Sequence, residues 1–135
     1  MRFRENRVAL VGDIKKAFLN IEVDAKDHDF LGFFWVEDVR GNNLSIAVYR
    51  FCCVVFRLNA SPFLLNGTIR HHLATFAKVD PEFVKRMVEG FHVDDLGSGD
   101  GTTERAFSLY QNEKERMPKW GFKLWKRKTN DPGLR

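Results

Sequence analysis

A nine-residue stretch, Phe91–Gly99 (FHVDDLGSG), constrains the fold of this chain more than any other part of its sequence. An acidic doublet stands between two short apolar runs, and glycines follow it, a pattern that predicts a tight β-hairpin with Asp94 and Asp95 at its tip. Adjacent carboxylates repel each other by about 4 kcal/mol at about 4 Å when the effective dielectric constant is near 20. The doublet therefore predicts a cation site, which a third carboxylate could complete.

Asp13 is the candidate for that third carboxylate. It closes the apolar run Val8–Asp13 (VALVGD), which predicts a buried strand with the acid at its carboxyl end, where sites in α/β proteins usually lie. The residues that follow have helical spacing and predict a short helix packed on the sheet; they are Ile14, Ala17, Phe18 and Ile21. A strand end and a hairpin tip can then bring three acids together.

The two acidic stretches together resemble the reverse transcriptases, whose first acidic motif has the form D-I-x-x-A-F and whose second is an aromatic-x-D-D turn. The resemblance is closest to the polymerase region of long-terminal-repeat retrotransposons, the Pao/BEL type in particular, and covers about Arg2 to Asn130. It implies an α/β (α+β) palm, an antiparallel sheet with helices packed on one face. We expect a partial palm domain over residues 1–130, with fingers and thumb largely absent, and a tail over residues 131–135.

The resemblance also implies the chemistry. An RNA-directed DNA polymerase adds deoxynucleotides to a primer 3′-hydroxyl by nucleotidyl transfer, with two metal ions about 3.5–4 Å apart on the attacking and leaving oxygens. The implied catalytic residues are Asp13, Asp94 and Asp95: the first two bridge the metals and Asp95 supports them. The Ile14 carbonyl is a further metal ligand. The expected metal is Mg²⁺, with Mn²⁺ as the alternative.

Five more residues match substrate-binding positions of the family. Phe18 lies five residues after Asp13, where an aromatic ring excludes a ribose 2′-hydroxyl, although a plain core phenylalanine is about as common in a chain with 13 of them. The loop before the next helix supplies Asn59, Ser61 and Pro62, which contact the incoming nucleotide and support the template. Lys126, in Gly121–Asn130 (GFKLWKRKTN), matches a lysine that contacts or protonates the pyrophosphate leaving group.

The chain departs from the family's pattern at two positions. Arg57 stands where the family has Gly, and its Cβ and long cation are expected to prevent close backbone approach, although its charge could contact phosphate. His92 stands where the family has Tyr, and strand alternation predicts that it shares a face with Asp94. His92 is either a degenerate substitution or a metal ligand and proton donor. The neighbouring pair His71 and His72 is expected at the surface.

The remaining pattern predicts the other elements. Strands are expected over 31–36 and 44–56, joined by a turn at 41–43, with 49–56 apolar enough to be buried on both faces. Helices are expected from Ser61, as N-cap, to about Phe76, after Asp80-Pro81, and from Thr102 or Thr103 to about Met117. Residues 121–130 are expected to form a strand and loop. Asp24 is a candidate helix N-cap.

Composition and charge limit the class of protein. With 135 residues and 44% hydrophobic content, the chain can fill one core. Residues 113–135 carry eight basic and three acidic side chains within a chain whose net charge is +4. This basic end suits a polyanion-binding surface or a solvated basic face equally well. Cys52 and Cys53 are adjacent, which disfavours a disulfide between them and indicates a reducing, intracellular setting.

The expected partners are an RNA or DNA template with its primer, deoxynucleoside triphosphates and the rest of a retroelement polyprotein, with no membrane. The expected location is the cytoplasm, in a retroelement particle. The competing hypothesis is a catalytically inactive palm remnant that folds or binds nucleic acid without polymerising. A metal-dependent phosphohydrolase also fits the acids, but it does not explain the Ser-Pro loop.

Overall fold

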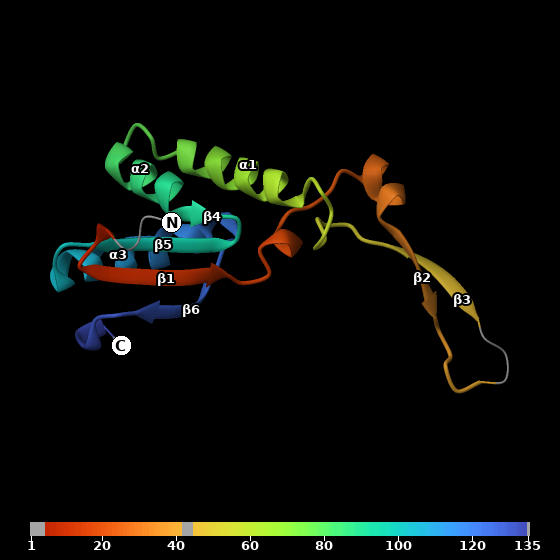
Figure 1. The fold of residues 1–135 in the computed structure, drawn as a ribbon. Helices are drawn as coiled ribbons and strands as arrows, with labels where there is room; N and C mark the ends of the chain where they lie inside the picture. The colour runs from red at the N-terminus through yellow and green to blue at the C-terminus, as the bar shows by residue number, and fades with distance from the viewer. Residues whose placement is uncertain (1–4, 42–44, 135) are drawn as a thin grey trace.

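The computed structural model describes residues 5–41 and 45–134 and has a body with a projecting hairpin (Figure 1). The body is built on one antiparallel sheet. Its strands, in spatial order, are β4 (Phe91–His92), β5 (Asp95–Asp100), β1 (Val8–Ile14) and β6 (Leu124–Thr129). The fold is therefore mixed α and β with an antiparallel sheet, as the sequence predicted.

In the described part of the chain, three α-helices accompany the sheet: α1 (Ser61–Ala74), α2 (Pro81–Gly90) and α3 (Thr103–Arg116). Asp80 caps α2 by accepting the Phe83 N–H at 3.1 Å, and Pro81 occupies its first turn, where no intrahelical donor is needed. Thr102 caps α3 in the same way by accepting the Arg105 N–H. Both starts were predicted from the sequence. The predicted Ser61 cap is wrong, because Ala60 holds the cap position and Ser61 is already helical.

One apolar core joins the three helices to the sheet. Its buried side chains come from β1, β5, the segments flanking them and all three helices: Ile14, Ala17, Phe18, Val54, Leu65, Ile69, Leu73, Phe83, Met87, Leu96, Leu109, Met117 and Phe122. Along β1, burial alternates with a period of two, so that Val8, Leu10 and Ile14 face the helices. Asp13 consequently lies on the other face of the sheet, away from the core.

Short 3₁₀ turns connect several of these elements: η2 (Phe18–Asn20), η3 (Ala25–Leu31), η4 (Met117–Trp120) and η5 (Pro132–Leu134). The helix predicted after Asp13 is wrong, because β1 continues to Ile14 and only η2 follows a turn. Asp24 caps η3 by accepting the Lys26 N–H at 3.1 Å, as predicted. In the segment predicted as a tail, Leu134 packs against a small cluster that includes Val8 and Leu10.

The hairpin of β2 (Gly32–Val36) and β3 (Ile46–Arg50) projects from the body (Figure 1). The hairpin itself was predicted, although residues 42–44 of its expected turn and second strand lie outside the described residues. Burial of 49–56 on both faces is wrong: Tyr49 is 47% exposed and Phe56 71%, and of this run only Val54 is fully buried. A two-stranded ribbon has no second layer in the described chain to cover it.

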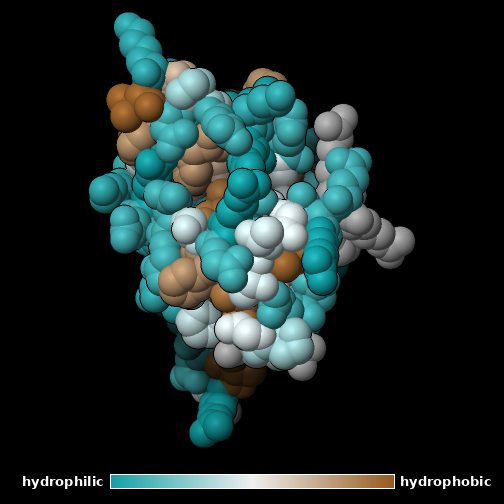
Figure 2. All heavy atoms as spheres, turned by 90° about the vertical axis from the view of Figure 1, so that its left-hand side faces the viewer, coloured by the Kyte–Doolittle hydropathy of each residue, from teal (hydrophilic) through white to brown (hydrophobic). Residues whose placement is uncertain are grey.

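The opposite end of the body is mostly hydrophilic. Figure 2 views the molecule from that end, and polar side chains cover most of it, with small apolar spots between them. The large exposed apolar side chains of β2 and β3 include Phe34, Trp35, Ile46 and Val48. The apolar surface is thus concentrated on the hairpin rather than on the far end of the sheet.

Candidate active site

The sheet brings the three predicted catalytic acids together. Strand β5 pairs antiparallel with β1 in a register that places Asp95 directly opposite Asp13. Asp94 lies in the two-residue turn between β4 and β5, and its backbone carbonyl accepts the Ile14 N–H at 2.9 Å. Directly opposed residues of an antiparallel pair lie on the same face, with Cβ atoms about 4.5–5.5 Å apart. Asp13 and Asp95 therefore share the open face, beside the turn that carries Asp94.

The electrostatics of Asp13 follow from this crowding. Burial is the largest cause that raises the pKa of the Asp13 carboxyl, and the charges of Asp94 and Asp95 raise it further. The Lys126 ammonium acts in the opposite direction and lowers this pKa. The ionised form of Asp13 is thus disfavoured by its surroundings, and a cation bound between the acids would favour it.

Backbone strain is concentrated around the same acids. Three of the four non-glycine residues with positive φ in the described chain flank them: Lys16 at 54°, Val93 at 58° and Lys126 at 49°. Val93 is β-branched and therefore disfavours this conformation especially, but the two-residue turn between paired strands requires it. Such conformations cost about 1–3 kcal/mol each and cluster at functional sites.

The strand alternation used to predict the face of His92 does not extend to Asp94, because Asp94 lies in the turn. Because the turn intervenes, His92 pairs with Asp95 across the β4–β5 ladder and does not continue a strand with Asp94. Its side chain is exposed. The imidazole therefore shares a face with Asp95 and, through the register of β1, with Asp13.

A cavity of about 610 Å³ opens beside the acids. Its walls include Asp13, Ile14, Phe18 and Asp94, together with apolar side chains from the segment that precedes α1. Phe18 is only 5% exposed, and its ring packs edge-on against Phe56 with centroids 4.9 Å apart. Phe18 is thus both a core residue and part of the wall nearest the acids, so the two interpretations of the sequence are compatible.

The loop before α1 contributes to this wall from behind. Ser61 is 1% exposed, and its hydroxyl donates to the Val55 carbonyl at 2.7 Å, which fixes a residue that lines the cavity. Asn59 and Pro62 are exposed at the start of α1. Substrate contacts by Asn59, Ser61 and Pro62 stay predictions, and the Ser61 hydroxyl is already engaged within the protein.

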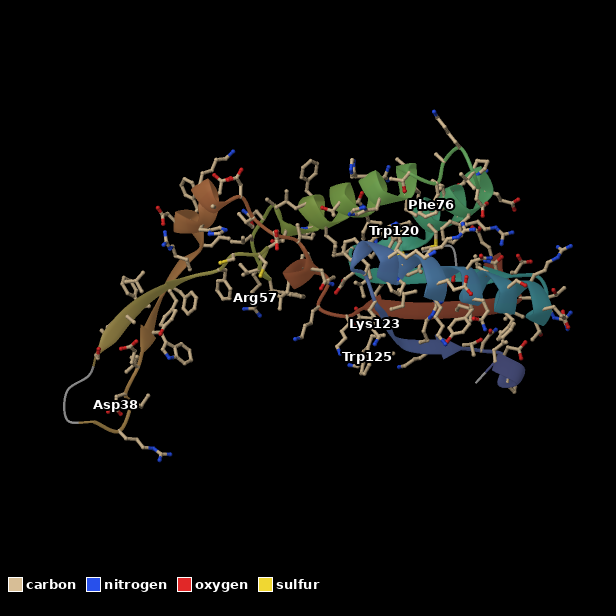
Figure 3. The ribbon with its side chains drawn as sticks, turned by 180° about the vertical axis from the view of Figure 1, so that it is seen from behind. Asp38, Arg57, Phe76, Trp120, Lys123 and Trp125 are labelled. Carbon is tan, nitrogen blue, oxygen red and sulfur yellow. The ribbon has the colours of Figure 1, made fainter. Side chains whose placement is uncertain are left out.

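Arg57 takes the conformation that a glycine would adopt without strain. Its φ is 70°, within the left-handed region that favours glycine. Figure 3 places Arg57 in the segment between the hairpin and α1, on the side of the body that carries Lys123 and Trp125. The chain therefore has a glycine-like backbone conformation at this position and places a cation there.

Two residues of the site were missed by the sequence analysis. Trp125 lies directly opposite Asp13 in the β1–β6 ladder and is 45% exposed on the open face. The Lys15 ammonium lies 4.8 Å from the centre of the Trp125 ring, a cation–π contact. The signal was present in the sequence as an aromatic residue among lysines, the pattern of surfaces that stack bases and bind phosphates. It was interpreted only as a basic strand.

The donor chemistry of the site fits Mg²⁺. Asp13, Asp94 and Asp95 offer only oxygen atoms, which is the ligand type that this ion accepts. Burial first, and then the charges of Asp94 and Asp95, raise the pKa of Asp13 despite the opposing charge of Lys126, so a bound cation would relieve this repulsion. Within residues 5–41 and 45–134, no group of three His, Cys, Asp or Glu side chains is already arranged as a complete ligand set.

Comparison with known proteins does not assign a function, so the geometry of the site is the basis for one. No protein-family model matches the chain, and no curated protein matches it. Among the described helices, none combines the length and the apolar character needed to cross a membrane.

Proposed function

We propose that this chain is the palm of an RNA-directed DNA polymerase, similar to those of Pao/BEL-type long-terminal-repeat retrotransposons. The single observation that carries the proposal is the convergence of Asp13 with the Asp94-Asp95 turn on the open face of an antiparallel sheet. Among the ion pairs of the described residues, none includes any of these three acids, and two-metal nucleotidyl transfer uses acids gathered in this way.

Each residue has a definite part in this proposal. Asp13 and Asp94 would hold the metal ions, Asp95 would support them, and the Ile14 carbonyl would be a further ligand; Asp13, Ile14 and Asp94 line the same cavity. Bound Mg²⁺, or Mn²⁺ in its place, supplies charge neutralisation at the triphosphate and a more acidic primer hydroxyl. The protein contributes the fixed strand register that presents the acids together.

The surroundings of the acids suit the other substrate groups. The Phe18 ring lines the cavity next to Asp13, where it would collide with a ribose 2′-hydroxyl and so favour deoxynucleotides. The charge of Lys126 acts on Asp13, which supports a role for this amine at the leaving phosphates of a nucleotide held there. Trp125 and Lys15 extend this side of the site with an aromatic face and a cation.

The proposed partners are an RNA or DNA template with its primer, deoxynucleoside triphosphates and the remainder of a retroelement polyprotein in a cytoplasmic particle. The basic residues of β6 support nucleic-acid binding, because Lys126 and Lys128 are exposed on the strand that borders the acids. Phosphate contacts of this kind contribute affinity that falls as salt is raised.

A palm remnant that binds nucleic acid without polymerising is the second candidate. Arg57 favours it, because a strained arginine occupies the place where the family has an unstrained glycine. His92, which faces Asp95, is the other departure next to the acids. In this case nucleic-acid binding persists while the acids have no effect on any reaction.

Single-nucleotide extension of a labelled primer on an RNA template separates the two candidates. The wild type is compared with Asp94→Asn at equal protein concentration in Mg²⁺ and in Mn²⁺, with Glu115→Gln as an exposed acid control on α3. We expect Asp94→Asn to slow extension by about 100-fold, equivalent to about 3 kcal/mol, and Glu115→Gln to have no effect. Retained nucleic-acid binding with no extension by the wild type would favour the inactive remnant.

A further inference from the structure

Strand β6 carries one residue more than the facing segment of β1. Val11 pairs with Lys128 and Asp13 pairs with Trp125, so Gly12 alone stands opposite both Lys126 and Arg127. This is a β-bulge, and Lys126 is its residue with positive φ, at 49°. The bulge makes Lys126 the extra residue beside Asp13 and returns Arg127 to the helix-covered face.

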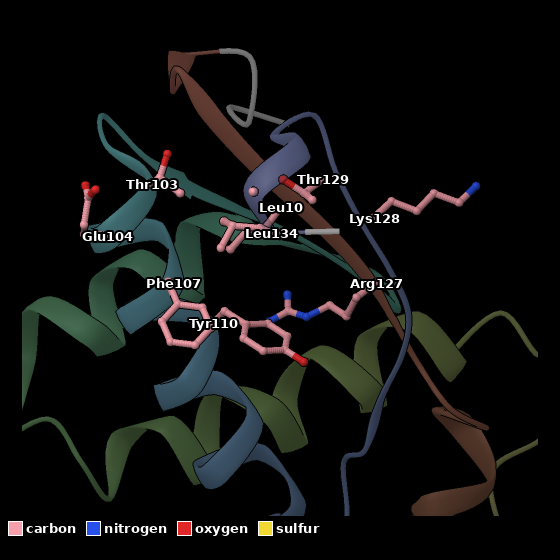
Figure 4. Close-up of a pocket in the computed structure, with 10 residues that line it drawn as sticks. Leu10, Thr103, Glu104, Phe107, Tyr110, Arg127, Lys128, Thr129 and Leu134 are labelled. Carbon is pink, nitrogen blue, oxygen red and sulfur yellow. The ribbon is translucent and has the colours of Figure 1, made fainter.

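Arg127 crosses the inner face of β1 at Gly12. A Cβ atom added to Gly12 would lie 2.7 Å from the Arg127 Cδ, so the arginine stem occupies the space that a side chain would need. From there the guanidinium reaches α3, where it forms an ion pair with Glu113 and lies 4.9 Å from the centre of the Tyr110 ring (Figure 4). Glu113 is completely buried.

This ion pair is incompletely satisfied. The Glu113 Oε1 and the Arg127 Nε and Nη1 are buried without a hydrogen-bond partner in the described chain. Replacing such a buried pair with apolar residues of similar volume is often neutral or stabilising, so stability alone gives little reason for the pair. Its geometric effect is specific: it anchors β6 to α3 at the point where the strand accommodates its extra residue.

We propose that Arg127 and Glu113 are positioning residues that maintain the β6 bulge and thereby hold the Lys126 ammonium beside Asp13. Gly12 is part of the same device, because only a residue without a side chain leaves room for the arginine stem. The role assigned to Lys126 rests on the proposed function, in which this amine meets the leaving phosphates. The control of the bulge by the ion pair does not depend on that function.

Nuclear magnetic resonance of the whole chain tests the bulge directly. In the wild type, positive φ at Lys126 gives a strong cross-peak between its own amide proton and Hα. We expect Arg127→Leu/Glu113→Leu to remain folded and lose this signature, while Lys128→Leu, an exposed change on the same strand, keeps it. Retention of the signature in the folded double variant would overturn the proposal.

Gly12→Ala provides a second variant that leaves both charges in place. Its methyl group must displace the Arg127 stem, so the same Lys126 signature should weaken or disappear. Combining Gly12→Ala with Arg127→Ala removes the collision between the added methyl group and the arginine stem. Adding Arg127→Ala to Gly12→Ala should therefore weaken the Lys126 signature little beyond the loss that Gly12→Ala already causes. An unchanged Lys126 signature in Gly12→Ala would overturn the proposal even where the double leucine variant fails to fold.

Primer extension then tests whether the bulge positions Lys126 for the reaction. We expect the double leucine variant to lower kcat to the same extent as Lys126→Gln, by roughly 100-fold for a lost proton donor, with the KM for primer–template unchanged. A lost bulge with unchanged kcat would refute the positioning role. Absence of extension by the wild type would instead refute the proposed function, and the magnetic resonance result would still decide whether the ion pair holds the bulge.

Discussion

Removing the charge of Asp13 should stabilise the protein. Asp13 lies directly opposite Asp95 and beside Asp94, and its pKa is raised by burial first and by those two charges next. Like charges directly opposed on a sheet are destabilising by about 0.2–1 kcal/mol. At about 2.1 cal/mol/K of unfolding entropy per residue, a gain of about 1 kcal/mol raises the Tm of a chain this size by roughly 3–4 °C. We therefore expect Asp13→Asn to melt a few degrees above the wild type at pH 7.

The direction of the Asp13 pKa shift determines how the Tm difference between Asp13→Asn and the wild type depends on pH. Because the folded-state pKa of Asp13 is above its ordinary value of 3.8, the cost of its charge is fully present above the folded-state pKa. As the pH falls through that pKa toward 3.8, Asp13 becomes protonated and the cost disappears, so the Tm difference between Asp13→Asn and the wild type should shrink.

Differential scanning calorimetry of both proteins from pH 3 to pH 8, without divalent metal, measures this difference. Glu115→Gln controls for the loss of a carboxylate elsewhere. Added Mn²⁺ should raise the Tm of the wild type and leave that of Asp13→Asn nearly unchanged, because a ligand stabilises only the state that binds it. A lower Tm for Asp13→Asn at pH 7, or a difference that does not change with pH, would refute the inferred repulsion.

Three further predictions concern single positions. Phe18→Ala should admit ribonucleotides in the extension assay, and unchanged sugar discrimination with extension intact would assign Phe18 to the core alone. Asp80→Ala should lose about 1 kcal/mol of stability as a helix cap, measured by urea unfolding. The hydrogen bond from the Phe83 N–H, and after it the one from Arg116, lower the pKa of Asp80. The stability lost in Asp80→Ala should therefore be complete above pH 3.8 and should diminish as the pH falls through the lower folded-state pKa. A loss of stability that does not change with pH would contradict this prediction. His92→Tyr should raise extension if His92 is a degenerate substitution, and a clear loss would instead make the imidazole a working part of the site.

The parts of the fold that local chemistry determines were predictable from the sequence. Asp80-Pro81 and Thr102 mark helix starts because a side-chain oxygen caps the first free N–H groups. The doublet at 94–95 marked a hairpin because the polar pair interrupts two apolar runs, but the predicted tip is one residue late: Val93 and Asp94 form the turn, and Asp95 already pairs with His92 in β5. These signals place Asp94 and Asp95 without any knowledge of the tertiary structure.

Other features depend on contacts that no local pattern encodes. The apolar run 49–56 resembles a buried strand, but burial depends on whether another layer covers it, and in the described chain Phe56 remains largely exposed. The bulge at Lys126 likewise depends on the pairing of Arg127 with Glu113, residues 14 apart whose contact forms only when α3 packs on the sheet. The sequence therefore predicted the acids of the site and missed the arrangement of β6 around them.

The most direct test of the proposed active site is a Mn²⁺ titration followed by electron paramagnetic resonance, with a chain-terminated primer on an RNA template and the next deoxynucleotide present. The wild type should bind Mn²⁺ saturably, and Asp13→Asn and Asp94→Asn should each lose that binding, because these two acids are the proposed bridging ligands. Glu115→Gln should bind as the wild type does. Equal Mn²⁺ affinity in all four proteins would show that neither Asp13 nor Asp94 is a metal ligand and would contradict the polymerase assignment.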